Sequence, residues 1–346
     1  MHELFVLTLG SILFFLFRWG FKNLPGENWQ IIASLPRQKQ ENGIWSGLNL
    51  TYYGFFNATA LGFAMGIWVI LMGSVGLSLL KTSAIGIPLI LLTFLASRLI
   101  AKWVEKKQYV ATIGGGAFAI YLLSPILVDL VERALPSPPV HVLTVLAGIS
   151  IAYALGEGVG RLACISFGCC YGKPLSESHR FLQRLFARWN FTFSGQTKKI
   201  AYAHGFDGQK VIPIQAVTAV FYAGTGLAAI FLFLKGWHGA AFLLTVGITQ
   251  VWRVLSEFFR ADYRGGGRIS AYQVMAFLCV AYGVFWAAVL PSPPAPPTDL
   301  WSGLKSLFSL EVILFLQGLW VVAFLFTGRS MVTASTISFH VMKDRV

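Results

Sequence analysis

The chain has 346 residues, of which 56% are apolar and only 12% are charged. This composition lies outside the range of soluble globular domains and indicates an integral membrane protein. The net charge of +13 does not indicate a nucleic-acid partner, because Lys and Arg lie between apolar runs and not along one soluble face; anionic lipid head groups are their expected partners.

Nine apolar runs are long enough to cross a bilayer, which requires about 20 residues each. In chain order they are Leu4–Phe21, Tyr53–Leu80, Ile85–Trp103, Val110–Val131, His141–Phe167, Ile212–Leu234, Ala240–Phe259, Ile269–Leu290 and Leu307–Phe326. The first lacks the flanking features of a signal peptide, so we expect a retained helix. The glycine-rich second half of the fifth predicts a re-entrant or unwound segment, which is tolerable only where it lines a cavity.

Two connections have a distinctive composition. The segment Lys173–Val211 is the one sizeable polar insertion, and it predicts a small basic cap at the membrane surface. The Pro-rich segment Pro291–Pro297 predicts a stiff, extended linker before the last helix.

Positive charge is distributed unevenly between the two sides of the predicted bundle. Of the 27 Lys and Arg residues, 20 lie in the connections after odd-numbered spans or in the C-terminal tail, and the other side holds Lys81, Arg133, Lys235 and Lys305. The positive-inside rule therefore predicts that the cap faces the cytoplasm.

The stretch Gly156–Pro174 combines five glycines and three cysteines with Glu157 and Arg161 at the end of an apolar run. An ionised Arg at membrane depth costs roughly 2.5 to 3.5 kcal/mol, so it normally faces a polar cavity and has a partner or ligand. The alternative is a local ion pair with Glu157, four residues earlier. We interpret this stretch as the floor of an active site.

Further arginines lie in other spans. At the end of the seventh run, offsets of four and three place Arg253, Glu257 and Arg260 on one helix face, a pattern suited to holding a phosphate. A salt-bridged helix end is the alternative. Arg98, inside the third run, either binds an anion or extends to the membrane interface.

Small and polar residues complete the set of candidates. Tyr53 opens the second run, where an interface anchor is the alternative, and Gly115 and Gly116 offer either close helix packing or backbone contact with a head group. Gln273 is a polar group near a span end that needs a partner. Cys164, Cys169 and Cys170 are soft ligands, but no His or acidic residue follows at metal spacing, so neither a metal nor another cofactor is predicted. Together the arginines, the glycines and Tyr53 predict an anion-binding cavity open to the bilayer, with a phospholipid phosphate as the anion.

These motifs resemble the prolipoprotein diacylglyceryl transferase family, seven-helix enzymes that move diacylglyceryl from phosphatidylglycerol to a lipoprotein cysteine. The matching pieces, in family order, are Tyr53-Gly54, Ser97-Arg98-Leu99, Gly114–Phe118, Gly160–Gly172, Pro213–Gln215, Arg253–Arg260 and Ser270–Gln273. They cover about residues 50 to 290. Positions that matter in the family correspond to Tyr53, Arg161, Gly172, Arg253, Glu257 and Arg260.

The resemblance implies an all-α polytopic membrane protein with a seven-helix transferase-like core, one extra helix at each end, and a small basic cap between core helices 4 and 5. The implied parts are 1–49 (extra helix and basic loop), 50–172 (core helices 1–4), 173–211 (cap), 212–290 (core helices 5–7) and 291–346 (linker, extra helix and tail). A multi-pass protein of the bacterial inner membrane is implied as well.

The sequence departs from the family at three places. The essential His expected after Phe118 is Ala119, the Asn of the signature is Cys164, and Gln215-Ala-Val-Thr218 replaces Gln-Leu-Tyr-Glu. The implied catalytic residues are Arg161, Arg253 and Tyr53. Those implied to bind substrate are Arg98, Gly115, Gly116, Cys164, Gly172, Gln215, Glu257, Arg260 and Gln273.

Three functions are compatible with these residues. In the first, diacylglyceryl passes from phosphatidylglycerol or another anionic phospholipid to a prolipoprotein cysteine, with Tyr53, His179 or His204 replacing the missing base. The second keeps the lipid donor but has a different acceptor, including one of the chain's own cysteines. The third is phospholipid binding or flipping without chemistry. A lipoprotein acceptor requires the cap side to face outward, opposite to the charge-based orientation.

Overall fold

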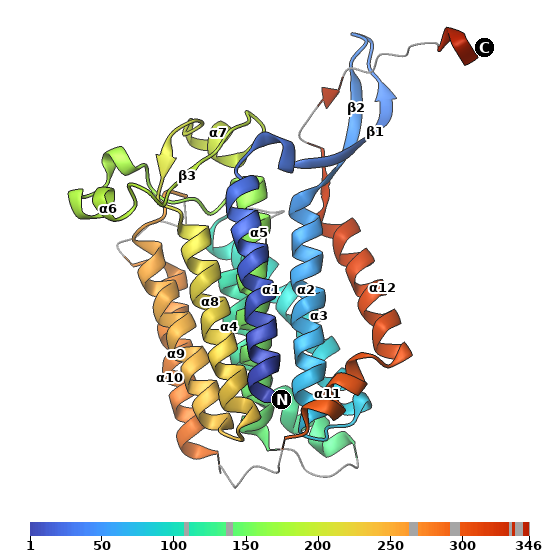
Figure 1. The fold of residues 1–346 in the computed structure, drawn as a ribbon, viewed down its shortest axis with the longest axis vertical. Coiled ribbons are helices and arrows are strands. Elements are labelled where there is room, and N and C mark those ends of the chain that lie inside the picture. The colour runs from blue at the N-terminus through green and yellow to red at the C-terminus, as the bar shows by residue number, and fades with distance from the viewer. Residues whose placement is uncertain are drawn as a thin grey trace.

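A computed structural model describes residues 1–106, 111–135, 141–262, 269–290, 298–331, 334–335 and 342–345. Within this part of the chain, nine helices are long and apolar enough to cross a membrane, as the sequence predicts. They are α1 (His2–Asn23), α2 (Tyr52–Ser74), α3 (Leu79–Val104), α4 (Ile113–Ala134), α5 (Val142–Phe167), α8 (Ile214–Leu234), α9 (His238–Glu257), α10 (Ala271–Val289) and α12 (Leu310–Thr327). They run up and down in one bundle (Figure 1). The chain is therefore a helical, multi-pass membrane protein.

Helix α5 lies at the centre of the bundle and packs against α2, α8, α9 and α4. It is one continuous helix to Phe167, so the expectation of a re-entrant or unwound segment is wrong. Its glycines allow close packing: a Cβ on Gly156 would lie 2.8 Å from Ala64 of α2, and one on Gly158 would lie 3.2 Å from a backbone oxygen of α8. The helix ends at Gly168, whose φ of 69° is left-handed.

The remaining long helices surround α5. Helix α3 packs on α4, and α10 contacts both α9 and α4. The first and last spans are peripheral: α1 lies against α8, and α12 against α2. The short helix α11 (Leu300–Leu307) also packs on α2, at the end of the bundle far from the cap.

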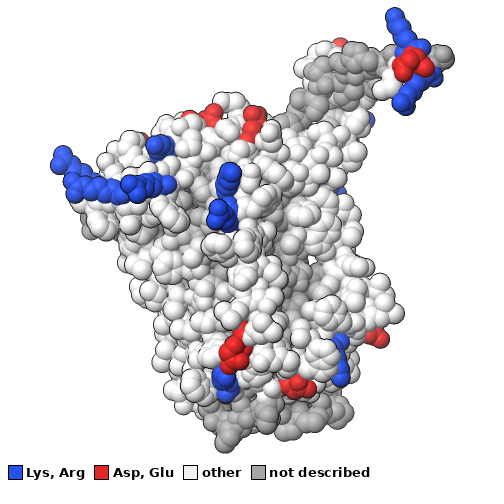
Figure 2. Space-filling view, viewed as in Figure 1, with Lys and Arg blue, Asp and Glu red and all other residues white. Residues whose placement is uncertain are grey.

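The cap lies over one end of the bundle (Figure 1). It consists of η2 (Leu175–Glu177), α6 (Arg180–Leu185), β3 (Phe191–Thr192), α7 (Lys199–His204) and β4 (Lys210–Val211), with β3 and β4 antiparallel. Lys and Arg side chains project from this end of the molecule, and the visible face of the bundle between the two ends carries few (Figure 2).

A β-hairpin, which the sequence analysis missed, stands beside the cap. Strands β1 (Ile31–Lys39) and β2 (Trp45–Thr51) pair antiparallel, and β2 also pairs with the short strands β5 (Arg329–Ser330) and β6 (Ala334–Ser335) from the C-terminal tail. The basic loop expected before residue 50 is thus largely a hairpin, preceded by the short helix η1 (Glu27–Trp29). The predicted linker at 291–297, as well as Lys107, Arg264 and Arg268, lies outside the described residues.

The start of α2 and the end of α12 meet with no space between their backbones. A Cβ on Gly54 would lie 2.1 Å from the Cα of Gly328, whereas a Cβ on Gly62, two turns along α2, would meet nothing within 4 Å. We therefore expect Gly54→Ala to lower the thermal unfolding midpoint in detergent by several degrees, because overpacking displaces backbone. Gly62→Ala is the control and should not lower it, because Ala favours a helix over Gly. Equal midpoints for the two variants would contradict this contact.

Candidate functional site

The alternating direction of the helices brings the sequence motifs to one end of the bundle. Helices α2, α4, α8 and α10 begin at the cap end, and α3, α5 and α9 end there (Figure 1). Tyr53, Arg161, Arg253 and Gln273 are all within two turns of such a terminus. Candidates that are up to 220 residues apart in sequence therefore lie near the same end of the bundle.

Arg161 and Arg253 converge on one carboxylate. Arg161 donates a short hydrogen bond to Oε1 of Glu157, one turn earlier on α5, and Nη2 of Arg253 lies 3.8 Å from the same oxygen. Arg253 Nη2 also donates to the hydroxyl of Tyr153 at 2.8 Å. The Nε atoms of both arginines are buried without a hydrogen-bond partner. Both guanidiniums thus reach the Glu157 carboxylate, Glu257 also interacts electrostatically with Arg253, and the two Nε donors remain unused and available to an anion.

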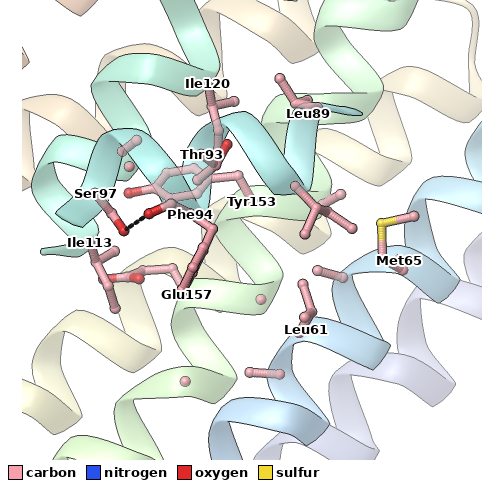
Figure 3. Close-up of a pocket in the computed structure, with 18 of the residues that line it drawn as sticks. Leu61, Met65, Leu89, Thr93, Phe94, Ser97, Ile113, Ile120, Tyr153 and Glu157 are labelled. Atoms are coloured by element: carbon pink, nitrogen blue, oxygen red, sulfur yellow. Dashed lines mark hydrogen bonds between the residues drawn. The ribbon is translucent and has the colours of Figure 1, made fainter. Parts of the chain in front are cut away.

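A cavity of about 350 Å³ opens beside this cluster, between α2, α3, α4 and α5. Most of its wall is apolar, with Leu61, Met65, Leu89 and Ile120 among the residues that Figure 3 labels. Its polar wall residues are Asn57, Thr93, Ser97, Thr112, Tyr153 and Glu157. The shape and lining suit an acyl chain with a polar group at one end.

Among the described residues, neither guanidinium is part of the cavity wall. Each contacts a residue that is: Arg161 and Arg253 both reach Glu157, and Arg253 also reaches Tyr153. Sequence reasoning overlooked Tyr153, although it precedes Glu157 by four residues and so lies on the same face of α5.

The three glycines of α4 divide between packing and the cavity. A Cβ on Gly114 would lie 2.6 Å from Tyr272 and 3.1 Å from Nη1 of Arg253, and one on Gly115 would lie 2.7 Å from Ile100 of α3. Gly116 is part of the cavity wall. Gly115 thus has the position of a helix-packing residue, and Gly116 combines both roles, because a Cβ there would also lie 3.1 Å from Thr93 of α3.

Tyr53 and three cysteines lie at the cap end of the same region. The Tyr53 ring centroid is 5.4 Å from that of Phe167. The Sγ atoms of Cys164, Cys169 and Cys170 all lie within 4.8 Å of one another. Gln215 donates from Nε2 to the carbonyl oxygen of Cys169 at 3.0 Å, so this predicted substrate-binding side chain supports the cysteine loop.

All four cysteines of the chain are free thiols. Hydrogen bonds with the Cys164 and Cys170 thiols, together with burial, raise the pKa of Cys169 well above its usual range. Cys169 is therefore a neutral thiol at physiological pH and a weak nucleophile by itself. This speaks against Cys169 as an acceptor of the lipid group.

Two predicted positions have other partners. Arg253 and Glu257 lie four residues apart within α9 and so share a helix face as predicted, but the prediction is wrong for Arg260, because α9 ends at Glu257. Arg260 lies beyond it and forms a bidentate ion pair with Asp262, at 2.9 and 3.0 Å. The Arg98 guanidinium lies 4.8 and 4.9 Å from the ring centroids of Phe94 and Phe326.

Three further candidates have clear structural contacts. Glu257 accepts a long hydrogen bond, 3.5 Å, from the hydroxyl of Ser270. Gln273 completes the capping box of α10 with Ser270. A Cβ on Gly172 would lie 2.4 Å from the backbone oxygen of Ile212, so only glycine fits there.

No protein-family profile matches the chain. The sequence is similar to phosphatidylglycerol–prolipoprotein diacylglyceryl transferase of Clostridium tetani (strain Massachusetts / E88), at 31% identity over 140 residues. The match covers 38% of this chain and 47% of the relative. This partial similarity agrees with the resemblance in the motifs.

The position where that resemblance expects a catalytic His is buried Ala119 of α4. The two histidines considered as replacements lie in the cap. Nδ1 of His204 lies 2.5 Å from the hydroxyl of Tyr171, and His179 caps α6 by accepting from the N–H of Phe181. Both are exposed. Neither has a contact with the Arg161 cluster among the described interactions.

Lys198 joins the cap to the bundle. Its fully buried Nζ donates to the carbonyl oxygens of Leu24 at 3.1 Å and Ser166 at 2.7 Å, at the ends of α1 and α5. Burial lowers its pKa to about 8 from 10.5.

The lowered pKa of Lys198 predicts a pH-dependent stability. Between pH 8 and 10.5 the unfolded chain binds more protons than the folded one at this site, so stability rises with pH by up to about 3 kcal/mol. We expect the unfolding midpoint of the wild type, relative to Lys198→Met, to increase across this window. A constant difference from pH 7.5 to 10.5 would contradict the lowered pKa.

Proposed function

We propose that the chain is a divergent diacylglyceryl transferase that moves the diacylglyceryl group of phosphatidylglycerol, or another anionic phospholipid, to the thiol of a prolipoprotein cysteine. The observation that carries this proposal is the convergence of two buried arginines, with free Nε donors, on Glu157 beside an apolar cavity. Guanidinium groups match phosphate oxygens bidentately, and the apolar cavity suits an acyl chain. The partial similarity to the clostridial enzyme supports the same reaction.

In the proposed reaction the acceptor thiolate attacks C3 of the glycerol that carries the acyl chains. A C–S bond forms, the C–O bond to phosphate breaks with its electron pair passing to oxygen, and glycerol phosphate leaves. Arg161 and Arg253 stabilise the developing negative charge on the departing phosphate. Because both guanidiniums are buried, this stabilisation is stronger than it would be in water.

A specific observation favours a second candidate, a phospholipid-binding or flipping protein without chemistry. Ala119 offers no group to take the proton from the acceptor thiol, and the cap histidines are bound elsewhere. The cavity and the arginines serve lipid binding equally well.

The deciding experiment is a transfer assay with the purified full chain in vesicles of radiolabelled phosphatidylglycerol and a lipobox peptide that contains one cysteine. We expect a thioether-linked diacylglyceryl peptide by mass spectrometry and an equal amount of released glycerol phosphate. Saturable lipid binding without either product would overturn transfer and favour the second candidate. Labelling of a different acceptor would support the phospholipid as the donor and overturn the prolipoprotein cysteine as the acceptor.

A further inference from the structure

Three of the four cysteines form a compact cluster that the proposed function does not use. Cys164 lies in the last turn of α5, and Cys169 and Cys170 directly follow that helix. Their sulfur atoms lie within 4.8 Å of one another; Cys164 and Cys169 are buried, and Cys170 is partly exposed. The fourth cysteine, Cys279, belongs to α10 and is not part of the cluster.

The spacing of the sulfurs suits one soft metal ion. Zinc binds thiolates at about 2.3 Å in tetrahedral geometry, which places the sulfurs about 3.8 Å apart. Sulfurs that lie within 4.8 Å of one another are close to that separation. Thiolate ligands favour zinc over magnesium or calcium, which prefer oxygen.

The loop that carries the cysteines is held in place by its backbone. The N–H of Cys169 donates to the carbonyl of Cys164 at 3.0 Å, and Gln215 binds the Cys169 carbonyl. Cys170 has a φ of 56°, in the left-handed region that residues other than glycine rarely adopt. This unusual conformation turns the chain directly after Cys169.

Cationic neighbours would balance the charge of such a site. A divalent zinc with three thiolates has a net charge of −1. Arg161 interacts electrostatically with Cys164, and Arg260 does so with Cys170. Their positive charge offsets the net negative charge of such a site, and the metal displaces the thiol protons when it binds.

The cluster lies close to the cavity. Gly160 and Asn57 both belong to the cavity wall. Cys164 follows Gly160 by four residues on α5, and Tyr53 precedes Asn57 by four residues on α2, so both lie one turn nearer the cap on the same helix faces. A group bound at the cysteines is therefore adjacent to the cap end of the lipid cavity.

We propose that Cys164, Cys169 and Cys170 bind one zinc ion through three thiolates, and that the fourth zinc position takes the acceptor thiol as its thiolate. This inference rests on the proposed transfer reaction. The acceptor sulfur replaces a water on zinc and loses its proton to solvent at the cap end; it then forms the C–S bond and leaves the metal as a thioether. Zinc thus lowers the pKa of the acceptor thiol, the task for which the chain lacks the family's histidine.

The test measures metal binding and needs no activity. The full chain is purified without chelator from cells grown with zinc, and its metal content and zinc X-ray absorption spectrum are recorded. We expect about one zinc per chain with three sulfur neighbours at about 2.3 Å and one oxygen or nitrogen. Replacement of Cys164, Cys169 or Cys170 by Ser should lower the zinc content at least tenfold, whereas the matched control Cys279→Ser should keep it.

Cobalt titration of the wild type provides a second measurement that does not depend on folding of the variants. Thiolate-to-cobalt charge-transfer bands and tetrahedral d–d bands are expected, and a cysteine peptide, unlike its serine counterpart, should raise the sulfur count from three to four. Absence of these bands from protein with free thiols, a disulfide within the cluster, or zinc retained in all three variants would overturn the proposal. Lipid transfer that persists in zinc-free protein would leave the proposed function standing and overturn the acceptor-binding role. A loaded zinc site in protein that transfers no lipid would leave zinc binding standing and overturn the proposed transfer reaction.

Discussion

Arg161→Lys and Arg253→Lys are each expected to reduce transfer from labelled phosphatidylglycerol about 100-fold or more, a loss typical of removing one donor to developing charge. Lysine keeps the positive charge but loses the planar fork that binds two phosphate oxygens at once. Both arginines are buried beside Glu157 and have an unused Nε donor. The measurement is the initial rate of formation of the diacylglyceryl peptide.

Arg188→Ala is the matched control, because Arg188 lies in the cap on the same side of the bundle and is exposed. It should keep the wild-type rate within about twofold, since surface charges contribute little. Unfolding midpoints must be compared for all three variants. A folded Arg161→Lys or Arg253→Lys protein with full activity would overturn the role of the cluster in phosphate binding.

The spans were predictable because about 20 consecutive apolar residues have only one stable arrangement in lipid. The same argument misled at α5, where glycines suggested a broken helix. In the folded bundle they permit α2 and α8 to approach α5, a use that becomes visible only with the neighbouring helices. The hairpin β1–β2 was missed because β1 is exposed along nearly all of its length and so lacks the burial alternation of a half-buried strand. The pairing of β2 with residues 329–330, far away in sequence, is not contained in any local pattern.

Helical offsets predicted which charged side chains pair within a continuous helix, and they failed for a residue beyond the end of a helix. Glu157 and Arg161 lie four apart within α5 and pair as the spacing implies. Arg260 was extrapolated beyond the end of α9, where Asp262 is its partner instead. The convergence of Arg253 on Glu157 joins two different helices, and no single-sequence pattern contains that contact.

The last prediction concerns the carboxylate that the two arginines share. Glu157→Gln leaves two guanidiniums close together in a low-dielectric interior without the carboxylate that they share. Breaking a buried ion pair by removing one partner destabilises a protein by about 3–5 kcal/mol, so the unfolding midpoint in neutral detergent should fall markedly.

Anionic lipid should compensate for the lost carboxylate. A phosphate at the free guanidinium donors restores the charge balance. Phosphatidylglycerol should therefore raise the unfolding midpoint of Glu157→Gln by more than it raises that of the wild type. Phosphatidylcholine, whose head group has no net charge, should not have this effect.

Glu132→Gln is the matched control: it removes a carboxylate 2.7 Å from the buried Nζ of Lys81, at the opposite end of the bundle. It should lose stability without gaining a specific response to phosphatidylglycerol. If both variants respond equally to the lipid, the Arg161–Glu157–Arg253 cluster is an internal salt bridge and not an anion site.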